Sequence, residues 1–470
     1  MKRLFWITVI LVLVNVLLTH VVAGVEDEAS VARRFCVDFF AADDDAMANV
    51  MDAPLKAAMT PEGSQQIRES LVVALGPLEE IGEAWYTDEV QGYRRYRVPV
   101  RFENGMQDLL VAFEPGGKVG GLFTVKHIER PSLEREAKAA ELPRPQTPQP
   151  PFDYRAEDVT YTSDEFVRAG TLTIPNGNGP FPAVLLLSGS GAQDRDSLLF
   201  GHRSFLLISD HLTRAGIAVL RVDDRGVGGS TGNLAESTLS DFAEDAIAGV
   251  RFLAARAEID AKRIGLIGHS EGGIVAPLAA SRSAVVGFVV ILAGTGVPGA
   301  QVMDLQMQQH MRLLGVSEET IEAAAIENRK LNSLIAEGAT TIAVKDQLAI
   351  LKRSQGDPTA VTPAELAQLT APWTRSFITY DPRPALAKIK VPVLALNGEL
   401  DFQVNPDQNL TAIRAALKHN SDVTLHRLPK LNHLFQTAET GAFDEYSRIE
   451  ETFTPVALDL IRDWILENTR

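Results

Sequence analysis

The sequence predicts an α/β protein: a doubly wound, mostly parallel sheet preceded by a small α+β domain. Three observations support this prediction. Near-continuous Val, Ile and Leu runs alternate with helical patterns through the C-terminal part of the chain, as expected for strands buried on both faces of a parallel sheet. One run leads into a turn rich in glycine. Before these runs, helical patterns give way to alternating polarity, which indicates a separate domain.

The apolar runs have the length and spacing of strands in an alternating βα chain. They lie at Ala183–Leu187, Ile217–Val222, Ile264–Ile267, Val286–Leu292 and Val391–Leu396, and Thr424–Leu428 is one further strand candidate. Helical patterns lie between them, as at Ser204–Ala215 and Leu239–Arg256. Thr171–Ile174, directly before a proline, predicts an antiparallel edge strand at the front. Ligands of such sheets bind at the carboxyl ends of the strands, so a site is expected in the loops after these runs.

Composition places the chain among ordinary globular proteins with room for two or three domains, since 45% of its 470 residues are hydrophobic and 23% are charged. The formal net charge of -16 argues against nucleic acid as a partner, because a broad acidic surface cannot neutralise phosphates. Cys36 is the only cysteine, so no internal disulfide can form, and we expect it to be a small buried residue.

The first 24 residues have the features of an export signal. Met1-Lys2-Arg3 supplies the charged start, Leu4–Leu18 the apolar core and Val21–Ala23 a small-residue cleavage site. The apolar run is short for a membrane span of about 20 residues. We therefore expect removal of residues 1–24 and export to the periplasm or the medium.

Residues 27–130 predict a small α+β domain. Helical spacing of apolar residues runs to about Ile81, and Trp85–His127 then alternates, with turns at Asn104-Gly105 and Gly116-Gly117. The segment from Pro54 to Gly63 resembles a domain of unknown function, cone-shaped in related folds, that often precedes secreted hydrolases. The domain could hold a ligand in its cone, but a spacer or homodimer contact is favoured.

Two further segments interrupt the pattern. Residues 131–155 contain closely spaced prolines, which favour extended backbone and predict a linker. From about 297 to 380 the strand pattern stops and helical composition takes over, which predicts an inserted cap over the strand ends. Met303, Met307 and Met311 recur there at helical spacing. They could line an acyl or aromatic pocket, or pack the cap onto the main body.

The candidate nucleophile is Ser270. The Ile264–Ile267 run leads into Gly268–Gly272, which reads Gly-His-Ser-Glu-Gly, and small residues then open a helical pattern. This is the G-x-S-x-G pattern in the strand–turn–helix context that gives it meaning. The turn would hold Ser270 in a strained conformation, and the glycines would remove colliding Cβ atoms. The Glu271 amide, at the helix start, is the first candidate oxyanion donor.

Two other loops complete the predicted surroundings. Ser188–Asp196 follows an early strand and is expected to supply the second oxyanion donor, with the Ser190 amide as first choice and that of Gly191 as second. Asp223–Ser230 is rich in glycine but lacks the lysine of a phosphate-binding loop and the spacing of a dinucleotide fingerprint. We expect it to be a structural turn whose Asp and Arg side chains brace neighbouring loops. No cofactor or metal site is predicted.

A serine nucleophile needs a base, and the base needs an acid to orient it. Asp401 lies in the loop after the Val391–Leu396 run, with Glu399 as its near rival. Among the nine histidines, His433 alone combines a position after this acid with a loop after the last predicted strand. The order serine, acid, histidine is that of one known arrangement of the triad.

Five ordered motifs, from about residue 158 to the C-terminus, resemble the α/β-hydrolase superfamily, close to exported bacterial esterases and serine aminopeptidase-like relatives. They are Gly189–Asp194, Arg221–Gly226, Gly268–Gly273, Leu396–Asp401 and Leu431–His433. The resemblance implies an α/β-hydrolase fold and supports the triad Ser270, Asp401 and His433. One departure is Ser188-Gly189, where many relatives have His-Gly, and it bears on the second oxyanion donor.

The predicted activity is hydrolysis of small-molecule carboxylic esters through an acyl-enzyme on Ser270. A serine aminopeptidase-like peptidase is the alternative; it would need cap carboxylates facing Ser270, and Glu318, Glu319 and Glu322 are candidates that have the pattern of a solvated helix face. A non-enzymatic envelope binding protein is the third hypothesis, although such a protein would not need all three triad positions.

Overall fold

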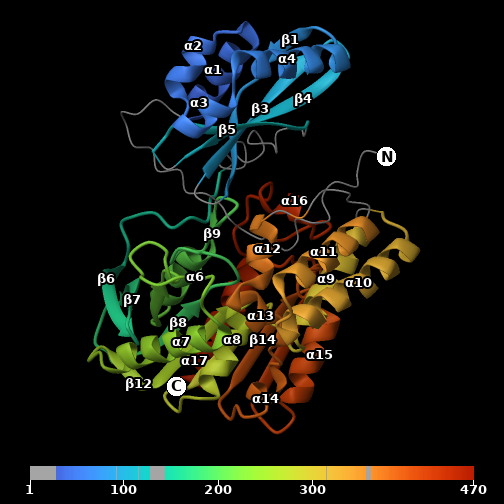
Figure 1. The fold of residues 1–470 in the computed structure, drawn as a ribbon. Coiled ribbons are helices and arrows are strands. Elements are labelled where there is room, and N and C mark those ends of the chain that lie inside the picture. The colour runs from blue at the N-terminus through green and yellow to red at the C-terminus, as the bar shows by residue number, and fades with distance from the viewer. Residues whose placement is uncertain are drawn as a thin grey trace. The chain divides into compact units, whose positions relative to one another are not determined.

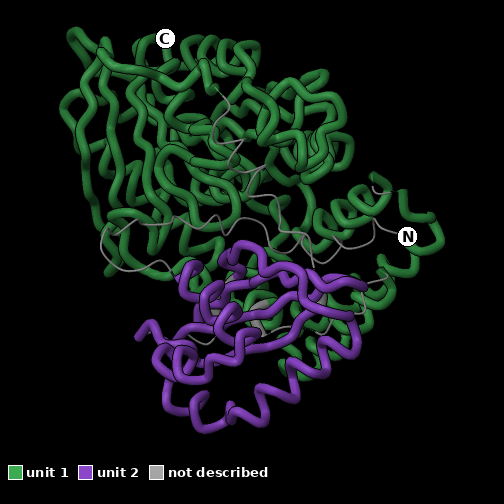
Figure 2. The backbone as a smooth tube through the Cα atoms, turned by 90° about the horizontal axis from the view of Figure 1, so that it is seen from above, with its two compact units in different colours: residues 1–16, 135–470 green, residues 17–134 purple. Residues whose placement is uncertain are grey.

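The computed structural model describes residues 28–90, 93–114, 116–127, 143–313, 315–355, 361 and 363–470. The described chain divides into an N-terminal unit, residues 28–127, and a C-terminal unit, residues 143–470 (Figure 2). The predicted export signal, residues 1–24, and residues 131–142 of the predicted linker lie outside the described residues.

The N-terminal unit packs helices against an antiparallel sheet, as its sequence pattern predicts (Figure 1). Its helices are α1 (Glu28–Ala41), α2 (Asp44–Val50), α3 (Ala53–Ala58) and α4 (Pro61–Leu75). Its strands are β1 (Leu78–Ile81), β2 (Trp85–Val90), β3 (Tyr93–Phe102), β4 (Gly105–Phe113) and β5 (Val119–Lys126). They pair in the order β1-β3-β4-β5, with β2 also on β3. Helices α3 and α4 begin where Asp52 and Thr60 cap the N–H groups of Leu55 and Gly63.

A separate hydrophobic core holds the N-terminal unit together. Phe35 and Phe39, four residues apart on α1, pack with Val98 and Val100, alternate residues of β3. Cys36 is buried in the same cluster as a free thiol, and burial raises its pKa far above the ordinary value. The expected role of Cys36 as a small buried residue is therefore confirmed.

The C-terminal unit contains an eight-stranded sheet within residues 143–470, in the order β15-β14-β13-β12-β8-β11-β7-β6 (Figure 1). Its strands are β6 (Tyr154–Ser163), β7 (Phe166–Pro175), β8 (Phe181–Leu187), β11 (Ala218–Val222), β12 (Ile259–His269), β13 (Phe288–Leu292), β14 (Val393–Gly398) and β15 (Val423–Leu428). The strands from β15 to β11 run parallel, whereas β7 and β6 are antiparallel to their neighbours. A two-stranded hairpin, β9 (Leu198–Leu199) and β10 (His202–Arg203), stands apart.

Helices cover both faces of this sheet, as the buried apolar runs predict. They are α6 (Ser204–Arg214), α7 (Leu239–Ala254), α8 (Gly272–Ala280), α14 (Arg383–Leu386), α15 (Pro406–Ala416) and α17 (Pro455–Asn468). The short helix α16 (Phe443–Tyr446) packs in a separate cluster with Leu199 and Leu434. Leu185 of β8 packs in the cluster that contains α7 and α8 residues. Its neighbours Val184 and Leu186 pack in the opposite cluster, with α6 and α17 residues. Alternate residues of a strand point to opposite faces, so one short run fills two cores.

One expectation about the sheet was wrong. Thr171–Ile174 belongs to an antiparallel strand, β7, but that strand is paired on both sides and does not form the edge. The edge is β6, which begins at Tyr154, so the last residues of the predicted linker lie in the sheet. Polar and apolar residues alternate along much of strand β6 because one of its faces is exposed. It therefore lacks the continuous apolar run by which the strands buried on both faces were predicted.

Between β13 and β14 lie the inserted helices, a name kept here for α9 (Gly299–Leu313), α10 (Glu318–Glu337), α11 (Thr341–Ser354), α12 (Pro363–Thr370) and α13 (Pro372–Thr379). They have a hydrophobic core of their own, in which Met307 and Met311 are buried and Met303 is partly buried. The methionine stripe thus packs these helices against one another. Neither of the two predicted roles, lining a ligand pocket or packing onto the main body, describes this packing of Met307 and Met311 within the inserted helices.

Among the helices of the described residues, none combines the length and hydropathy of a bilayer-spanning segment.

Candidate active site

Ser270 lies at a sharp turn between β12 and α8. Its φ is +55°, in the left-handed region that residues other than glycine seldom adopt. The Ser270 N–H donates to the Leu292 carbonyl oxygen of β13 at 2.8 Å, and the Ser270 carbonyl oxygen accepts from the Gly273 N–H at 2.9 Å. The strained residue is therefore held from both sides, by the sheet and by the start of the helix.

The glycines on either side of Ser270 allow this turn to close. A Cβ atom on Gly268 would collide with the carbonyl oxygen of Gly272, and one on Gly272 would collide with that of Leu187. Both collisions would be with backbone, which cannot move aside without distorting the sheet. The glycine spacing of the motif is thus a requirement of the turn.

Asp401 and His433 meet in the loops that follow β14 and β15. His433 Nδ1 lies 2.8 Å from Asp401 Oδ2, and both side chains are buried. Asp401 Oδ1 accepts the N–H groups of Gln403 and Val404, each at 2.9 Å. The carboxylate is fixed by its own loop, and it can hold the imidazole in the tautomer that leaves Nε2 to accept a proton.

Glu399, the rival acid, is placed differently. It is exposed, and its Oε2 accepts the Lys430 N–H at 3.2 Å. Of the two acids in this loop, the structure therefore places Asp401 beside His433.

The loop of His433 is attached to the Ser270 turn through His269. His269 Nε2 donates to the His433 carbonyl oxygen at 2.9 Å, and the two rings lie 4.9 Å apart. Burial and the neighbouring His433 lower the pKa of His269 to about 3, so this ring is neutral at ordinary pH. No hydrogen bond joins the Ser270 hydroxyl to His433 within the described residues.

The two predicted oxyanion donors are available. In the part of the chain that the structure describes, neither the Glu271 N–H nor the Ser190 N–H donates to another protein group, and the neighbouring Gly191 N–H is likewise unbonded. The loop that carries Ser190 lies against the nucleophile, since a Cβ on Gly189 would stand 3.3 Å from Ser270 Cβ. Unpaired amides beside a serine can receive the negative oxygen of an acyl-transfer intermediate.

The Asp223–Ser230 turn braces that loop, as the sequence predicts. The Asp223 carboxylate accepts two hydrogen bonds from Arg195, one from the Arg195 backbone N–H at 2.9 Å and one from its Nη2 at 2.7 Å. Asp224 accepts the Ser188 hydroxyl at 2.6 Å and the Gln193 N–H at 2.8 Å. The two carboxylates therefore hold the loop that contains Ser190 in place through residues on either side of Ser190.

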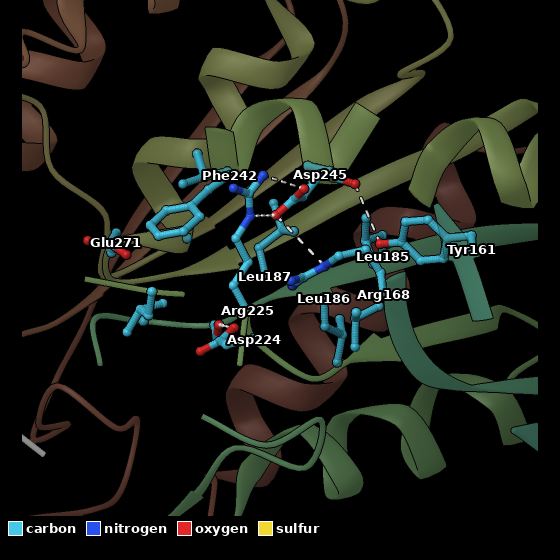
Figure 3. A pocket seen from close by; sticks show the side chains of 17 residues that line it. Tyr161, Arg168, Leu185, Leu186, Leu187, Asp224, Arg225, Phe242, Asp245 and Glu271 are labelled. Carbon is cyan, nitrogen blue, oxygen red and sulfur yellow. Dashed lines mark hydrogen bonds and ion pairs between the residues drawn. The ribbon is translucent and has the colours of Figure 1, made fainter. Parts of the chain in front are cut away.

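Two carboxyl groups near the Ser270 turn have raised pKa values. Burial raises the pKa of Glu271 to about 8, and the nearby Asp224 contributes. Burial also raises the pKa of Asp224, to about 7. Both side chains border a cavity of about 60 Å³, whose charged lining also includes Arg168, Arg225 and Asp245 (Figure 3).

Three features of the site were not predicted from the sequence. Two are hydrogen bonds: His269 Nε2 to the His433 carbonyl oxygen, and Trp373 Nε1 in α13 to Glu271 Oε2 at 2.7 Å. The third is the burial of the Glu271 side chain. Glu271 and Trp373 are 102 residues apart. The sequence carries one signal for His269 and Glu271, their places within the motif, and none for Trp373. Within the described residues, no group of three or more His, Cys, Asp or Glu side chains is placed to hold a metal ion.

The sequence is similar to one curated protein, the esterase EstD of Thermotoga maritima, at 27% identity over 395 residues, which covers 83% of this chain and 84% of that protein. Among solved structures, an esterase of Pyrococcus furiosus matches 67% of this chain and 90% of its own at 18% identity, with a TM-score of 0.42. Est1E of Butyrivibrio proteoclasticus matches 66% of this chain and 98% of its own at 15% identity, with a TM-score of 0.39.

A family model described as the alpha/beta hydrolase family matches residues 184–444, more than half of the chain. The matched region begins in β8, contains Ser270 and ends beyond His433. The parallel sheet, the strained turn and this match lead to one conclusion: the chain belongs to the alpha/beta hydrolase family.

Proposed function

We propose that this chain is a carboxylic ester hydrolase that forms an acyl-enzyme on Ser270. The observation that carries the proposal is the Ser270 turn, with a left-handed φ of +55°, in the same unit as the His433–Asp401 pair at 2.8 Å. An unactivated serine is a weak nucleophile, and a histidine oriented by a buried acid is the usual activator. The similarity to an esterase over 83% of the chain supports the same reaction class.

In the proposed mechanism, His433 Nε2 takes the proton of the Ser270 hydroxyl as its oxygen attacks the ester carbonyl carbon. The amides of Glu271 and Ser190 stabilise the oxyanion, and the protonated His433 gives its proton to the departing alcohol. Water, deprotonated in turn by His433, then attacks the acyl carbon and releases the carboxylic acid from Ser270.

The mechanism requires Ser270 Oγ to reach His433 Nε2 when substrate binds. Catalytic hydrogen bonds are commonly long in enzymes without substrate and shorten in the complex. The His269 bond to the His433 backbone supports this step, because it keeps the base beside the turn.

The peptidase alternative receives no support from the proposed acidic positions. Glu318, Glu319 and Glu322 are all exposed on α10, and Glu318 pairs with Arg312 at 2.8 Å. Carboxylates exposed to solvent, of which Glu318 already holds a cation, are poor candidates for capturing a peptide amino terminus.

A panel of p-nitrophenyl esters and aminoacyl anilides, with wild type and Ser270→Ala, tests the proposal. We expect ester turnover in the wild type and a loss of several orders of magnitude in kcat for the variant. A fluorophosphonate should label Ser270, as peptide mapping would show. Ester turnover unchanged by Ser270→Ala would refute the mechanism, and faster turnover of the anilides would favour the peptidase.

We further propose that residues 1–24 are removed on export, because of their charged and apolar pattern. N-terminal sequencing of protein recovered from the periplasm or medium would start near residue 25, and an intact Met1 would contradict this.

We also propose that the N-terminal unit forms a homodimer contact, because Val37, Ile67 and Val73 expose apolar surface on α1 and α4. Sedimentation of Val73→Lys beside wild type tests this, and equal masses would contradict it.

A further inference from the structure

The side chain of Glu271 joins three segments around the nucleophile. It directly follows Ser270 but turns inward and is 5% exposed. Its Oε2 accepts Trp373 Nε1 of α13 at 2.7 Å and lies 3.5 Å from the Ser190 hydroxyl of the loop after β8. The turn, the oxyanion loop and the last of the inserted helices therefore meet at one carboxyl oxygen.

No cation pairs with Glu271 within the described residues. The arginines bordering the same cavity are engaged elsewhere: Arg225 binds Asp245 through two hydrogen bonds of 2.7 and 2.9 Å, and Arg168 donates to the Asp223 carbonyl oxygen at 2.9 Å. In Figure 3 both guanidinium groups point toward Asp245.

The other titratable groups around the cavity do not favour a charge on Glu271 either. Asp224 faces it as a second carboxyl and raises its pKa. Tyr161, at the far side of the cavity in Figure 3, is kept neutral because burial raises its pKa beyond the ordinary range. A carboxyl buried without a cation and beside another carboxyl is more stable when protonated.

The charge on Glu271 bears directly on the proposed reaction. The backbone N–H of this residue is one of the two predicted oxyanion donors, and its side chain touches the residue that carries the other. The ester carbonyl oxygen becomes negatively charged as Ser270 attacks. In a site of low dielectric, a second negative charge close to that oxygen is strongly unfavourable.

We propose that Glu271 acts as a neutral acid: it is a positioning residue that holds Ser190 and Trp373 around the oxyanion site, and its ionisation slows the reaction. This inference deepens the proposed esterase function and rests on it. The class of reaction is unchanged, but the structure assigns the alkaline limit of activity to a side chain outside the triad.

Three proteins, compared over pH 6 to about 9.5, separate this role from a structural one. In wild type, kcat should fall roughly tenfold as pH rises through the Glu271 pKa of about 8, which is less than the about 100-fold cost of a lost oxyanion donor. Glu271→Gln keeps an acceptor for Trp373 and the backbone amide but cannot ionise, so the alkaline fall should disappear. The readout for Glu271→Gln is therefore the shape of its pH profile, scaled to its own kcat at pH 7.

Trp373→Phe is the matched variant, because it leaves Glu271 titratable but removes a hydrogen bond that lowers its pKa. The alkaline fall should therefore persist in Trp373→Phe and move to higher pH. If Glu271 had a merely structural role, substitutions around it would change kcat without shifting the pH at which the alkaline fall occurs. The rate of Ser270 labelling by a fluorophosphonate, measured over the same pH range, gives a second readout that needs no turnover.

An identical alkaline fall in all three proteins would overturn the inference and leave the esterase proposal intact. An alkaline fall that persists at the same pH in Glu271→Gln would also overturn it, since the fall would then come from another group. If Glu271→Gln does not fold, as judged by circular dichroism, the shift expected for Trp373→Phe decides. Absence of both turnover and Ser270 labelling in wild type would instead refute the proposed function, and the inference with it.

Discussion

The Asp401 carboxylate accepts four hydrogen bonds from the groups around it. Its oxygens accept from His433 Nδ1, from Asn397 Nδ2 at 3.0 Å, and from two backbone N–H groups. A buried carboxylate with this many donors is fixed in position, and charge-assisted bonds of this kind are about twice as strong as neutral ones. The proposed role of Asp401 in orienting His433 follows from this rigidity.

Asp401→Asn should lower kcat for a p-nitrophenyl ester by about 1000- to 10,000-fold, because the amide nitrogen cannot accept from His433 Nδ1–H and the wrong tautomer is favoured. Glu399→Gln is the control: it changes a carboxylate two residues away that is exposed and contacts Lys430 instead. We expect its kcat within about twofold of wild type. Equal losses in both variants, or a loss only in Glu399→Gln, would remove Asp401 from the proposed triad.

The sequence could predict the Asp401–His433 pair but not the surroundings of Glu271. Ser270, Asp401 and His433 each follow a predicted strand, and chain order together with a loop position selects one of the nine histidines. The partners of the Glu271 carboxyl have no such signal, because Trp373 lies in an insertion whose packing is set by its own hydrophobic core. The Glu271 carboxyl is buried without a cation because of residues that only the folded chain brings around it, so the local sequence does not predict this.

Strands buried on both faces were predictable from their continuous apolar runs: β8 ends where its run predicts, and β11 begins within one residue of the expected position. Helix α7 begins, and strand β15 ends, at the expected residue. Strand β6 was missed because one of its faces is exposed and its polar residues match a linker as well as an edge strand. The inserted helices were predicted as helical, but the direction in which their methionines point depends on how they pack together.

The elbow formed by β12, Ser270 and α8 leads to a stability prediction. Gly272→Ala would place a Cβ atom against the carbonyl oxygen of Leu187, so either the turn or the end of β8 must shift. We expect a loss of about 3 kcal/mol or more in the free energy of unfolding, with loss of activity, because such overpacking meets backbone. The measurement is urea unfolding followed by circular dichroism.

Gly216→Ala is the control for Gly272→Ala. Gly216 also has a positive φ, +93°, but no atom lies within 4 Å of its ideal Cβ position. Only the backbone conformation is then penalised, by about 1–2 kcal/mol, and Ser270 activity should remain. If Gly272→Ala were no more destabilising than Gly216→Ala, the close approach of the elbow to β8 would be contradicted.

All the residues assigned to the site, from Ser190 to His433, belong to the C-terminal unit. That unit also has cores of its own on both faces of its sheet and among the inserted helices. The N-terminal unit has a separate core, and none of its described residues is assigned to the proposed chemistry. The activity should therefore depend on one unit, with the other acting on solubility, placement or assembly.

A fragment beginning at residue 143 tests this division. Because the site and its supporting cores lie within residues 143–470, we expect the fragment to hydrolyse p-nitrophenyl esters with a kcat/KM within about threefold of the full chain. Titration of Ser270 with a fluorophosphonate corrects for any misfolded fraction, and Ser270→Ala in the fragment is the control. A folded fragment that is labelled on Ser270 but loses more than about 30-fold in kcat/KM would show that the N-terminal unit takes part in substrate binding.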